Sequence, residues 1–297
     1  MSRKTRAFLA VILAAILSGG NPTFTKIGLN EFPPLGFIFV RFLISLVFVS
    51  AILVKGLKKA RQELLPIVLL SLLSTANIVL FTFGVKRTTA TMSQMIYAVV
   101  PILAAVLSAK LLKEAMTVRK IGGIVLGLVG MALIVLLPLI NHSTASSGDL
   151  VGNLMIVLGA VSFSVYSVYS KRFQEKYSPA FLTAIFLLTT ALVSGILAFG
   201  EYLNNPDLWG NISVNAWLAM GYVALLGTAG FYFLYQYAIQ AGSPVIASMI
   251  LYLAPVTAFG WAFFLLGERL TTTIVAGAIL VLSGAWLVTG SNRVQSR

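Results

Sequence analysis

Two positively charged side chains fall inside long apolar stretches of this 297-residue chain, where each could bind an anion. If those stretches lie in a membrane, an ionised side chain costs about 2.5–3.5 kcal/mol on insertion scales, so it is expected to be paired or functional. Lys26 lies near the end of its stretch, so it is either an interfacial anchor or a binding group. Arg41 lies about 12 Å inside the next stretch. It either pairs with backbone carbonyls or helix ends, or binds an anionic group.

Uncharged polar and aromatic residues recur at helical spacing in several of these stretches. Residues three or four positions apart share one face of a helix, and in a membrane such a face should turn toward the protein interior. These side chains either form hydrogen bonds between helices or line a pocket. We favour a pocket, because the set is rich in tyrosine and recurs in both halves of the chain. The predicted ligand-binding residues are Asn21, Lys26, Arg41, Asn77, Gln94, Tyr97, Ser162, Tyr166, Tyr169, Tyr232, Ser248 and Tyr252.

Two prolines and two glutamates are candidates for gating or structural roles. Pro101 and Pro255 lie on such polar faces and remove helix hydrogen bonds, so they permit bending. Glu114 and Glu268 each lie in a short turn, where a carboxylate favours the positive start of the following helix. We predict that both cap their turns, and a part in gating is the alternative.

Several kinds of chemistry lack the residues they need. The chain has no cysteine, one histidine (His142, in a polar loop) and no P-loop pattern, so we expect no metal site and no cofactor. All 8 acidic residues fall in loops or at helix ends, which disfavours proton coupling through a buried acid. Membrane enzymes such as lipid-modifying transferases need clusters of His, Asp or Glu side chains near the membrane interface. The acids here are scattered and the histidine is single, so we do not expect the chain to be an enzyme.

The composition predicts an all-α membrane protein. Hydrophobic residues make up 59% of the chain and charged residues 10%, against about 25% charged in soluble domains. Apolar stretches of about 20 residues span a bilayer as helices, because a helix satisfies its own backbone hydrogen bonds. Ten transmembrane helices are predicted at residues 7–29, from the Pro33–Pro34 break to 54, and at 64–84, 90–111, 118–140, 151–170, 179–202, 214–239, 243–266 and 272–290.

The helices form two related halves. The stretch SPVIASMILYLAPVTAFGWAFFLLGE corresponds to TATMSQMIYAVVPILAAVLSAKLLKE, which places Pro255 on Pro101 and Glu268 on Glu114. We divide the chain into repeats 1–145 and 146–297. Because five helices per repeat is an odd number, the second repeat is inverted. Most of the 21 Lys and Arg residues then share one side with both termini, which predicts cytoplasmic termini and explains the net charge of +13 without nucleic acid.

These stretches resemble a known family. SPVIASMILYLAPVTAFGWAFFLLGE, together with LSGGNPTFTKIGLNEFPPLGFIFVRFL near the start, is similar to the signature of EamA-type transporters of the drug/metabolite transporter superfamily. Ser18 and Pro22 depart from the family pattern, which commonly has Trp and an aromatic residue there. The resemblance implies a ten-helix secondary transporter of small metabolites. Related small multidrug exporters trade protons for cationic drugs through a buried Glu, which is absent here, so the resemblance disfavours a hydrophobic cation as substrate and favours a neutral or zwitterionic one.

The resemblance and the residues together lead to one expectation with an alternative. We expect export of small neutral or zwitterionic metabolites, amino acids first, by alternating access, across a bacterial inner membrane. The expected partners are the small-molecule substrate and the lipid bilayer, and the chain is expected to be a monomer or weak dimer. The alternative keeps the fold but carries phosphorylated sugars or nucleotide sugars on Lys26 and Arg41. A sensor or scaffold would need a soluble appendage, which the short loops do not supply.

Overall fold

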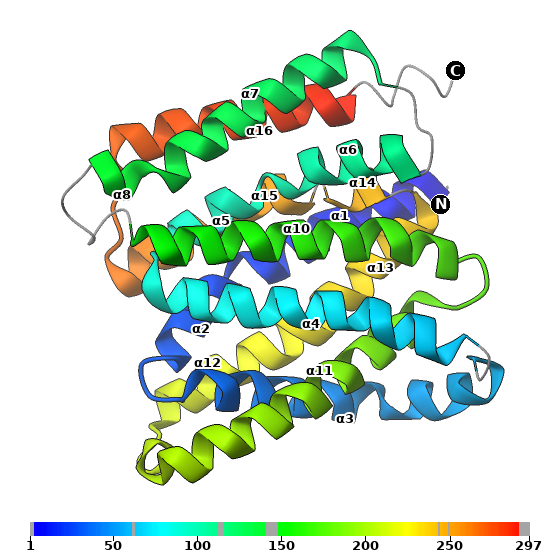
Figure 1. The fold of residues 1–297 in the computed structure, drawn as a ribbon, viewed down its shortest axis with the longest axis vertical. Helices are drawn as coiled ribbons and strands as arrows, with labels where there is room; N and C mark the ends of the chain where they lie inside the picture. The colour runs from blue at the N-terminus through cyan, green and yellow to red at the C-terminus, as the bar shows by residue number, and fades with distance from the viewer. Residues whose placement is uncertain are drawn as a thin grey trace.

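A bundle of helices makes up the whole computed structural model, which describes residues 3–60, 63–111, 116–140, 148–242, 244–248 and 250–290 (Figure 1). No strand occurs in these ranges. The first repeat contains α1 (Arg3–Gly19), α2 (Asn21–Gly28), α3 (Pro34–Ala60), α4 (Leu64–Arg87), α5 (Ala90–Tyr97), α6 (Val100–Leu111), α7 (Val118–Val135) and α8 (Leu137–Ile140). The second contains α10 (Leu150–Phe173), α11 (Pro179–Asn204), η1 (Pro206–Trp209), α12 (Val214–Ala224), η2 (Leu225–Gly230), α13 (Phe231–Ala241), α14 (Pro244–Ser248), α15 (Ile250–Leu266) and α16 (Thr272–Gly290).

The elements follow the ten predicted stretches, but several stretches are interrupted. The stretch 7–29 divides into α1 and α2 at Gly20, and the stretch 90–111 divides into α5 and α6 at Ala98–Val99. A proline is the second residue of the later helix in both cases, Pro22 and Pro101. Proline has no N–H for the residue four positions earlier, so the helix breaks just before it. Pro255 instead lies inside α15.

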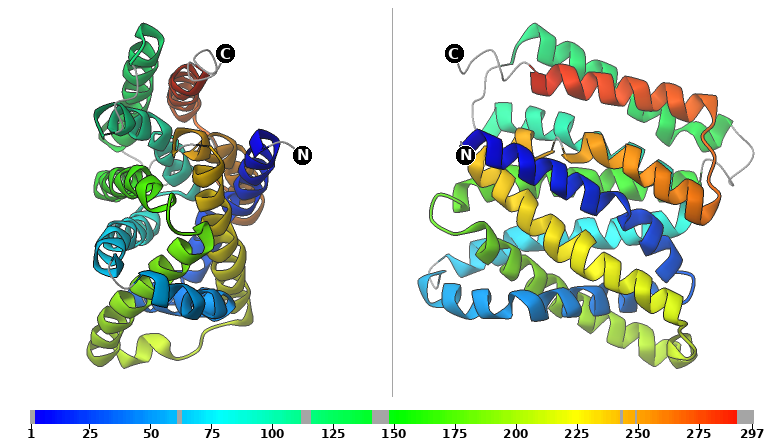
Figure 2. Two further views of the ribbon diagram at one scale, coloured as in Figure 1. Left: turned by 90° about the vertical axis from the view of Figure 1, so that its right-hand side faces the viewer. Right: turned by 180° about the vertical axis from the view of Figure 1, so that it is seen from behind.

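Packing pairs equivalent helices of the two repeats. In both views α7 lies along α16 at one edge and α3 along α11 at the other (Figures 1 and 2). Between these pairs, α1 packs on α13 and α15, and its counterpart α10 packs on α4, α5 and α6. Each of these contacts therefore has a counterpart in which the two repeats exchange places. The start of α1 and the end of α16 lie on the same side of the bundle (Figure 1).

Side-chain polarity suits a bilayer. Large apolar residues such as Phe48, Phe264 and Trp286 are more than half exposed, whereas many Ser, Thr and Asn side chains are buried. A wide exposed apolar surface marks contact with a membrane or a partner. Among the described helices, six are long and apolar enough to cross a membrane: residues 64–87, 90–111, 118–135, 150–173, 179–204 and 214–241. Shorter apolar helices cover residues 34–48, 253–266 and 272–288.

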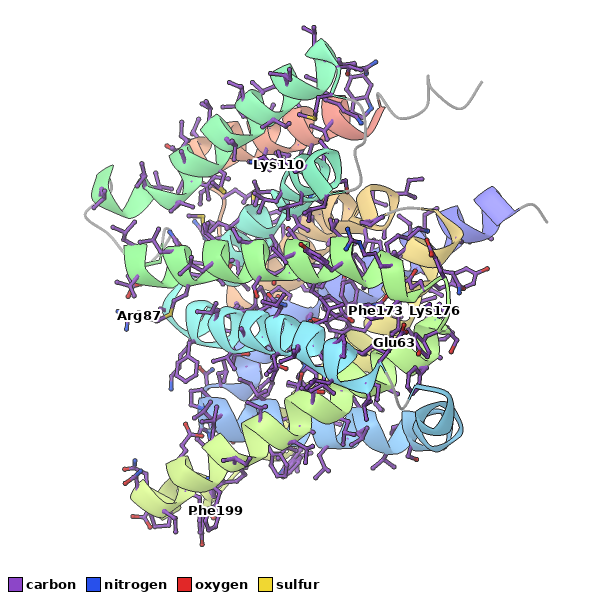
Figure 3. All side chains as sticks on the ribbon, turned by 45° about the vertical axis from the view of Figure 1, so that its right-hand side comes forward. Glu63, Arg87, Lys110, Phe173, Lys176 and Phe199 are labelled. Atoms are coloured by element: carbon purple, nitrogen blue, oxygen red, sulfur yellow. The ribbon has the colours of Figure 1, made fainter. Side chains whose placement is uncertain are left out.

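Ion pairs mark the two ends of the bundle. Lys176 and Glu63 form a salt bridge at one end, and Arg87 lies at the opposite end (Figure 3). The Arg87 guanidinium pairs with Asp149 at 2.7 Å. Asp149 also accepts a hydrogen bond from the Gly152 amide at 2.5 Å, which caps the start of α10. Although burial raises the pKa of Asp149, the bonds from Arg87 and Gly152 and the charge of Arg87 outweigh it, so the pKa lies below its ordinary value.

The Asp149→Asn variant should be less stable than the wild type at neutral pH, where the Asp149 carboxylate is ionised and paired with Arg87. Asn caps helices about as well as Asp, so the variant loses mainly the ionic interaction. A lowered folded-state pKa stabilises the protein above the unfolded-state pKa and ceases to do so as pH falls through the folded-state value. The wild type should therefore melt above the variant at neutral pH, and the gap should close toward about pH 3. Melting curves in detergent test this; a gap that persists in acid contradicts it.

Candidate functional site

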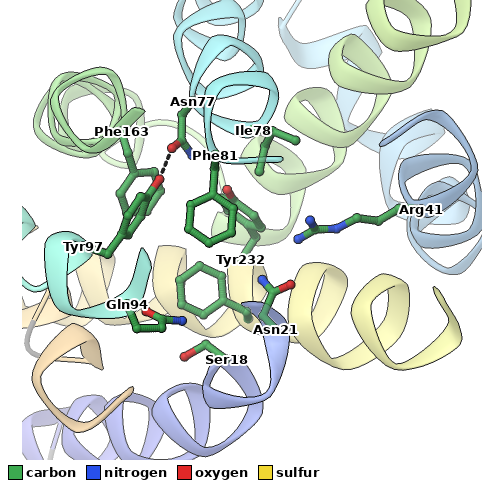
Figure 4. Close-up of a pocket in the computed structure, with 11 residues that line it drawn as sticks. Ser18, Asn21, Arg41, Asn77, Ile78, Phe81, Gln94, Tyr97, Phe163 and Tyr232 are labelled. Carbon is green, nitrogen blue, oxygen red and sulfur yellow. Dashed lines mark hydrogen bonds between the residues drawn. The ribbon is translucent and has the colours of Figure 1, made fainter. Parts of the chain in front are cut away.

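A cavity lined by both polar and aromatic side chains lies inside the bundle, between the two repeats (Figure 4). Its lining is contributed by α1, α2, α3, α4 and α5 of the first repeat and by α10 and α13 of the second: Ser18, Asn21, Arg41, Asn77, Ile78, Phe81, Gln94, Tyr97, Phe163, Phe231 and Tyr232. The space open to water-sized molecules is about 40 Å³, room for about three waters. Both repeats would thus touch a small molecule bound there.

Interruptions of the backbone meet beside this cavity. The α1–α2 break lies between Ser18 and Asn21, and α5 ends at Tyr97. Across from them, η2 is a π-helical segment, a type of bulge common at functional sites. The amide of Asn21 donates to the η2 carbonyl of Gly227 at 3.3 Å, so two irregular segments from different repeats hold each other. Irregular backbone at membrane depth is tolerated where it lines a cavity.

Arg41 extends its guanidinium from α3 into the cavity, opposite Tyr97 (Figure 4). The residue is 1% exposed. Its Nε donates to the hydroxyl of Thr228 in η2, which itself donates at 2.7 Å to the carbonyl of Val223, near the end of α12. The guanidinium carbon also lies 5.4 Å from the centre of the Phe42 ring. The π-helical turn thus presents the hydroxyl that positions Arg41.

Aromatic rings and amides form the rest of the wall. The Tyr97 hydroxyl donates to the side-chain oxygen of Asn77, which joins α5 to α4. The Tyr97 ring packs edge-on against Phe81, with centroids 5.0 Å apart. Phe163 and Tyr232 are likewise edge-on at 6.2 Å. These contacts give the cavity neutral hydrogen-bonding groups on a largely aromatic wall.

The structure brings together six of the predicted binding residues. Asn21, Arg41, Asn77, Gln94, Tyr97 and Tyr232 line the cavity. Ser162 lies on the α10 face that meets α4, where its hydroxyl donates to the Leu73 carbonyl at 2.7 Å. Tyr169 lies under the guanidinium of Arg172, 5.4 Å from it, and does not line the cavity. The side chains of Ser248 and Tyr252, and all of Glu114, lie outside the described residues.

Lys26 and Tyr166 do not line the cavity. The ammonium group of Lys26 donates to the carbonyl of Thr88, at the end of α4. A cation is favourable at a helix C-terminus, so Lys26 holds this end. The Tyr166 hydroxyl accepts a bond from Gln236 at 2.5 Å, and Gln236 accepts one from Gln174, so this chain leads from the cavity wall toward the end of α10.

Glu268 contacts a different helix from the one predicted. Gly267 has a φ of +66°, in the left-handed region, and follows the end of α15. The turn directs Glu268 to the start of α5, where its carboxylate accepts from the amides of Ala90 and Thr91 at 2.8 and 2.9 Å. The next helix, α16, is capped instead by Thr271, whose hydroxyl accepts from the Ile274 amide. Glu268 thus joins the two repeats at the end of the bundle that holds Arg87.

Sequence reasoning missed the apolar part of the wall. Ile78, Phe163 and Phe231 line the cavity, and in the sequence Ile78 and Phe231 look like ordinary core residues. Phe163 lies three positions before Tyr166, so the two residues share one face of α10, and this spacing could have identified Phe163. The sequence pattern predicted Ser162 instead, which is one position away. One residue turns a helix by about 100°. Among the described residues, no three His, Asp or Glu side chains gather as metal ligands.

Comparison with known proteins gives one family. A model of the EamA-like transporter family matches the chain twice, at residues 5–136 and 150–290. An uncharacterized transporter of Archaeoglobus fulgidus is 28% identical over 300 residues, covering 97% of this chain and 98% of that protein. The uncharacterized transporter YoaV of Bacillus subtilis is 26% identical, covering 96% and 97%. A crystal structure of a protein 19% identical to this chain superposes with a TM-score of 0.68 over 100% of both chains, so the two share a fold.

Proposed function

The chain belongs to the EamA-like transporter family, and from that membership we propose that it exports small neutral or zwitterionic metabolites, amino acids first among them, by alternating access. The observation that carries this proposal is the cavity between the repeats. Asn21, Gln94 and Tyr97 line it from the first repeat and Tyr232 from the second. When one repeat rocks against the other, a molecule held by both is exposed first on one side and then on the other.

The chemistry of the lining supports a small substrate that is uncharged or zwitterionic. Neutral side chains make up ten of the 11 lining residues that Figure 4 draws, with Arg41 as the exception. Amides and tyrosine hydroxyls can bind the polar groups of such a substrate, and the rings of Phe81 and Phe163 its apolar part. The small volume of the cavity, about 40 Å³, also favours a small molecule.

One observation weighs against the alternative substrates. Phosphorylated sugars and nucleotide sugars carry more than one negative charge, and the alternative required Lys26 and Arg41 to act together. Lys26 instead donates to the Thr88 carbonyl and does not line the cavity. A single guanidinium leaves part of such a charge without a partner, so we do not adopt this alternative.

The remaining parts of the proposal concern the cellular setting. The chain would be a multi-pass protein of a bacterial inner membrane with both termini in the cytoplasm, because the cations gather on that side. It would act as a monomer or weak dimer, without a cofactor and without enzymatic activity. In this orientation Glu268 and the start of α5 would lie at the outer end, and we propose that their contact closes the cavity toward the outside.

Counterflow in liposomes tests the proposal. Purified protein is reconstituted with one unlabelled amino acid inside, and uptake of the same labelled compound is followed. At least one amino acid should accumulate transiently above protein-free liposomes. A panel of amino acids without any counterflow contradicts the proposal, and counterflow with phosphorylated sugars alone would restore the alternative.

A further inference from the structure

Arg41 combines deep burial with an incomplete set of partners. At 1% exposure it is the largest fully buried side chain among the described residues. Its Nε is bonded to Thr228, whereas its Nη1, buried as well, has no hydrogen-bond partner among the described residues. The guanidinium points into the cavity (Figure 4). A buried charge is expected to be paired, and an unmade bond on a charged group is costly.

Among the described residues, no acidic side chain pairs with this charge. None of the residues that line the cavity is acidic. Three described glutamates are instead engaged at helix starts: Glu31 accepts from Ser213, Glu201 from the Gly36 amide, and Glu268 from Ala90 and Thr91. Asp149 and Glu63 are paired with Arg87 and Lys176 at the ends of the bundle. The positive charge inside the cavity is therefore left for a ligand to neutralise.

We infer that Arg41 binds one carboxylate of the substrate, and that this carboxylate, rather than an amino group, is what the cavity recognises. The planar fork of a guanidinium suits a carboxylate. The inference rests on the proposed function and redefines its substrate class as compounds that carry one carboxylate, whether or not they also carry an amino group. Amino acids qualify through their carboxylate, and so do the corresponding acids without an amino group. An ammonium group would find no carboxylate in the lining, so amines without a carboxylate are excluded.

Matched ligands test the inference on the unmodified protein. Two series differ only in their charged groups: alanine, propionate and ethylamine; leucine, 4-methylpentanoate and 3-methylbutylamine. Ligand binding to the folded state raises the melting temperature by mass action. The acids should raise it in at least one series and the amines should not. Equal shifts for acid and amine, or no shift with any carboxylate, would overturn the inference. Inorganic phosphate should give a smaller shift than the acids, and a larger one would overturn it too.

Variants test whether Arg41 is the receptor. Arg41→Gln should weaken binding of the acids by roughly tenfold to a hundredfold, since a hydrogen bond to a charged group is lost, and Arg41→Lys should retain part of it. The matched control is Lys86→Gln, which removes an exposed cation at the end of α4 and should leave binding unchanged. Unchanged affinity in Arg41→Gln would overturn the inference.

The melting temperature of Arg41→Gln without ligand shows whether Arg41 binds a ligand or stabilises the fold. Because the unliganded guanidinium lacks a counter-ion, Arg41→Gln should melt at or above the wild type without ligand. Thr228 keeps its bond to the Val223 carbonyl in the variant. A variant that melts well below the wild type would assign Arg41 a structural role and overturn the inference. The two proposals can be told apart by experiment. If carboxylates bind at Arg41 but no metabolite shows counterflow, the proposed function is wrong while the inference about Arg41 stands.

Discussion

Glu268→Gln is expected to expose the cavity to the side on which Glu268 lies and to slow transport. The carboxylate accepts from two amides at the start of α5, at 2.8 and 2.9 Å. An amide side chain offers a single acceptor oxygen and loses the charge that the helix N-terminus favours. Losing one such bond costs about 1.5–3 kcal/mol, which shifts a two-state equilibrium at least about tenfold. Under alternating access, the state closed at this end becomes less populated.

Thiol labelling measures this shift directly, because the chain contains no cysteine. Ser18 lines the cavity and is 4% exposed, so Ser18→Cys introduces a single, hidden thiol. A membrane-impermeant maleimide applied from the side of the membrane on which Glu268 lies should react at least about tenfold faster when Glu268→Gln is added. Asp207→Asn is the control, since it removes an exposed carboxylate of η1. Equal labelling rates in all three proteins would show that Glu268 does not hold the cavity closed.

Gly123→Ala is expected to destabilise the pair of helices α7 and α16, although Ala favours helix formation by about 1 kcal/mol. A Cβ at Gly123 would lie 2.5 Å from the carbonyl oxygen of Gly284, and a Cβ at Gly284 would lie 2.4 Å from that of Gly123. These contacts are with backbone, which cannot rotate away. The two helices must therefore separate, and such overpacking costs about 1–3 kcal/mol. Small residues at membrane helix interfaces permit this approach.

Gly122→Ala provides the matched control in the same helix. A Cβ at Gly122 meets nothing within 4 Å. It should therefore be neutral or raise the stability by up to about 1 kcal/mol through helix propensity. Thermal unfolding in detergent compares the two variants, with Gly284→Ala expected to match Gly123→Ala. If Gly122→Ala and Gly123→Ala melt at the same temperature, close contact between α7 and α16 does not limit stability.

The sequence alone determined the fold class and the broad role of the protein. Long apolar stretches must be helical in a bilayer, where the backbone has no water to bond. The duplication of Pro101 as Pro255, and of Glu114 as Glu268, indicated two repeats, and the residues of those motifs indicated the transporter family that the comparisons show. The polar faces were also visible as periodic patterns, which is why six predicted residues meet at one cavity.

Tertiary structure decided which of those residues act together. Lys26 and Arg41 are both cations in apolar stretches, but Lys26 ends beside the carbonyl of Thr88 and Arg41 ends in the cavity. Glu268 binds amides that lie 177 and 178 positions away in the chain, a distance over which local pattern carries no information. The π-helical turn that presents Thr228 to Arg41 likewise depends on packing between repeats. Periodicity gives the face of each helix, whereas contacts between helices decide which faces meet.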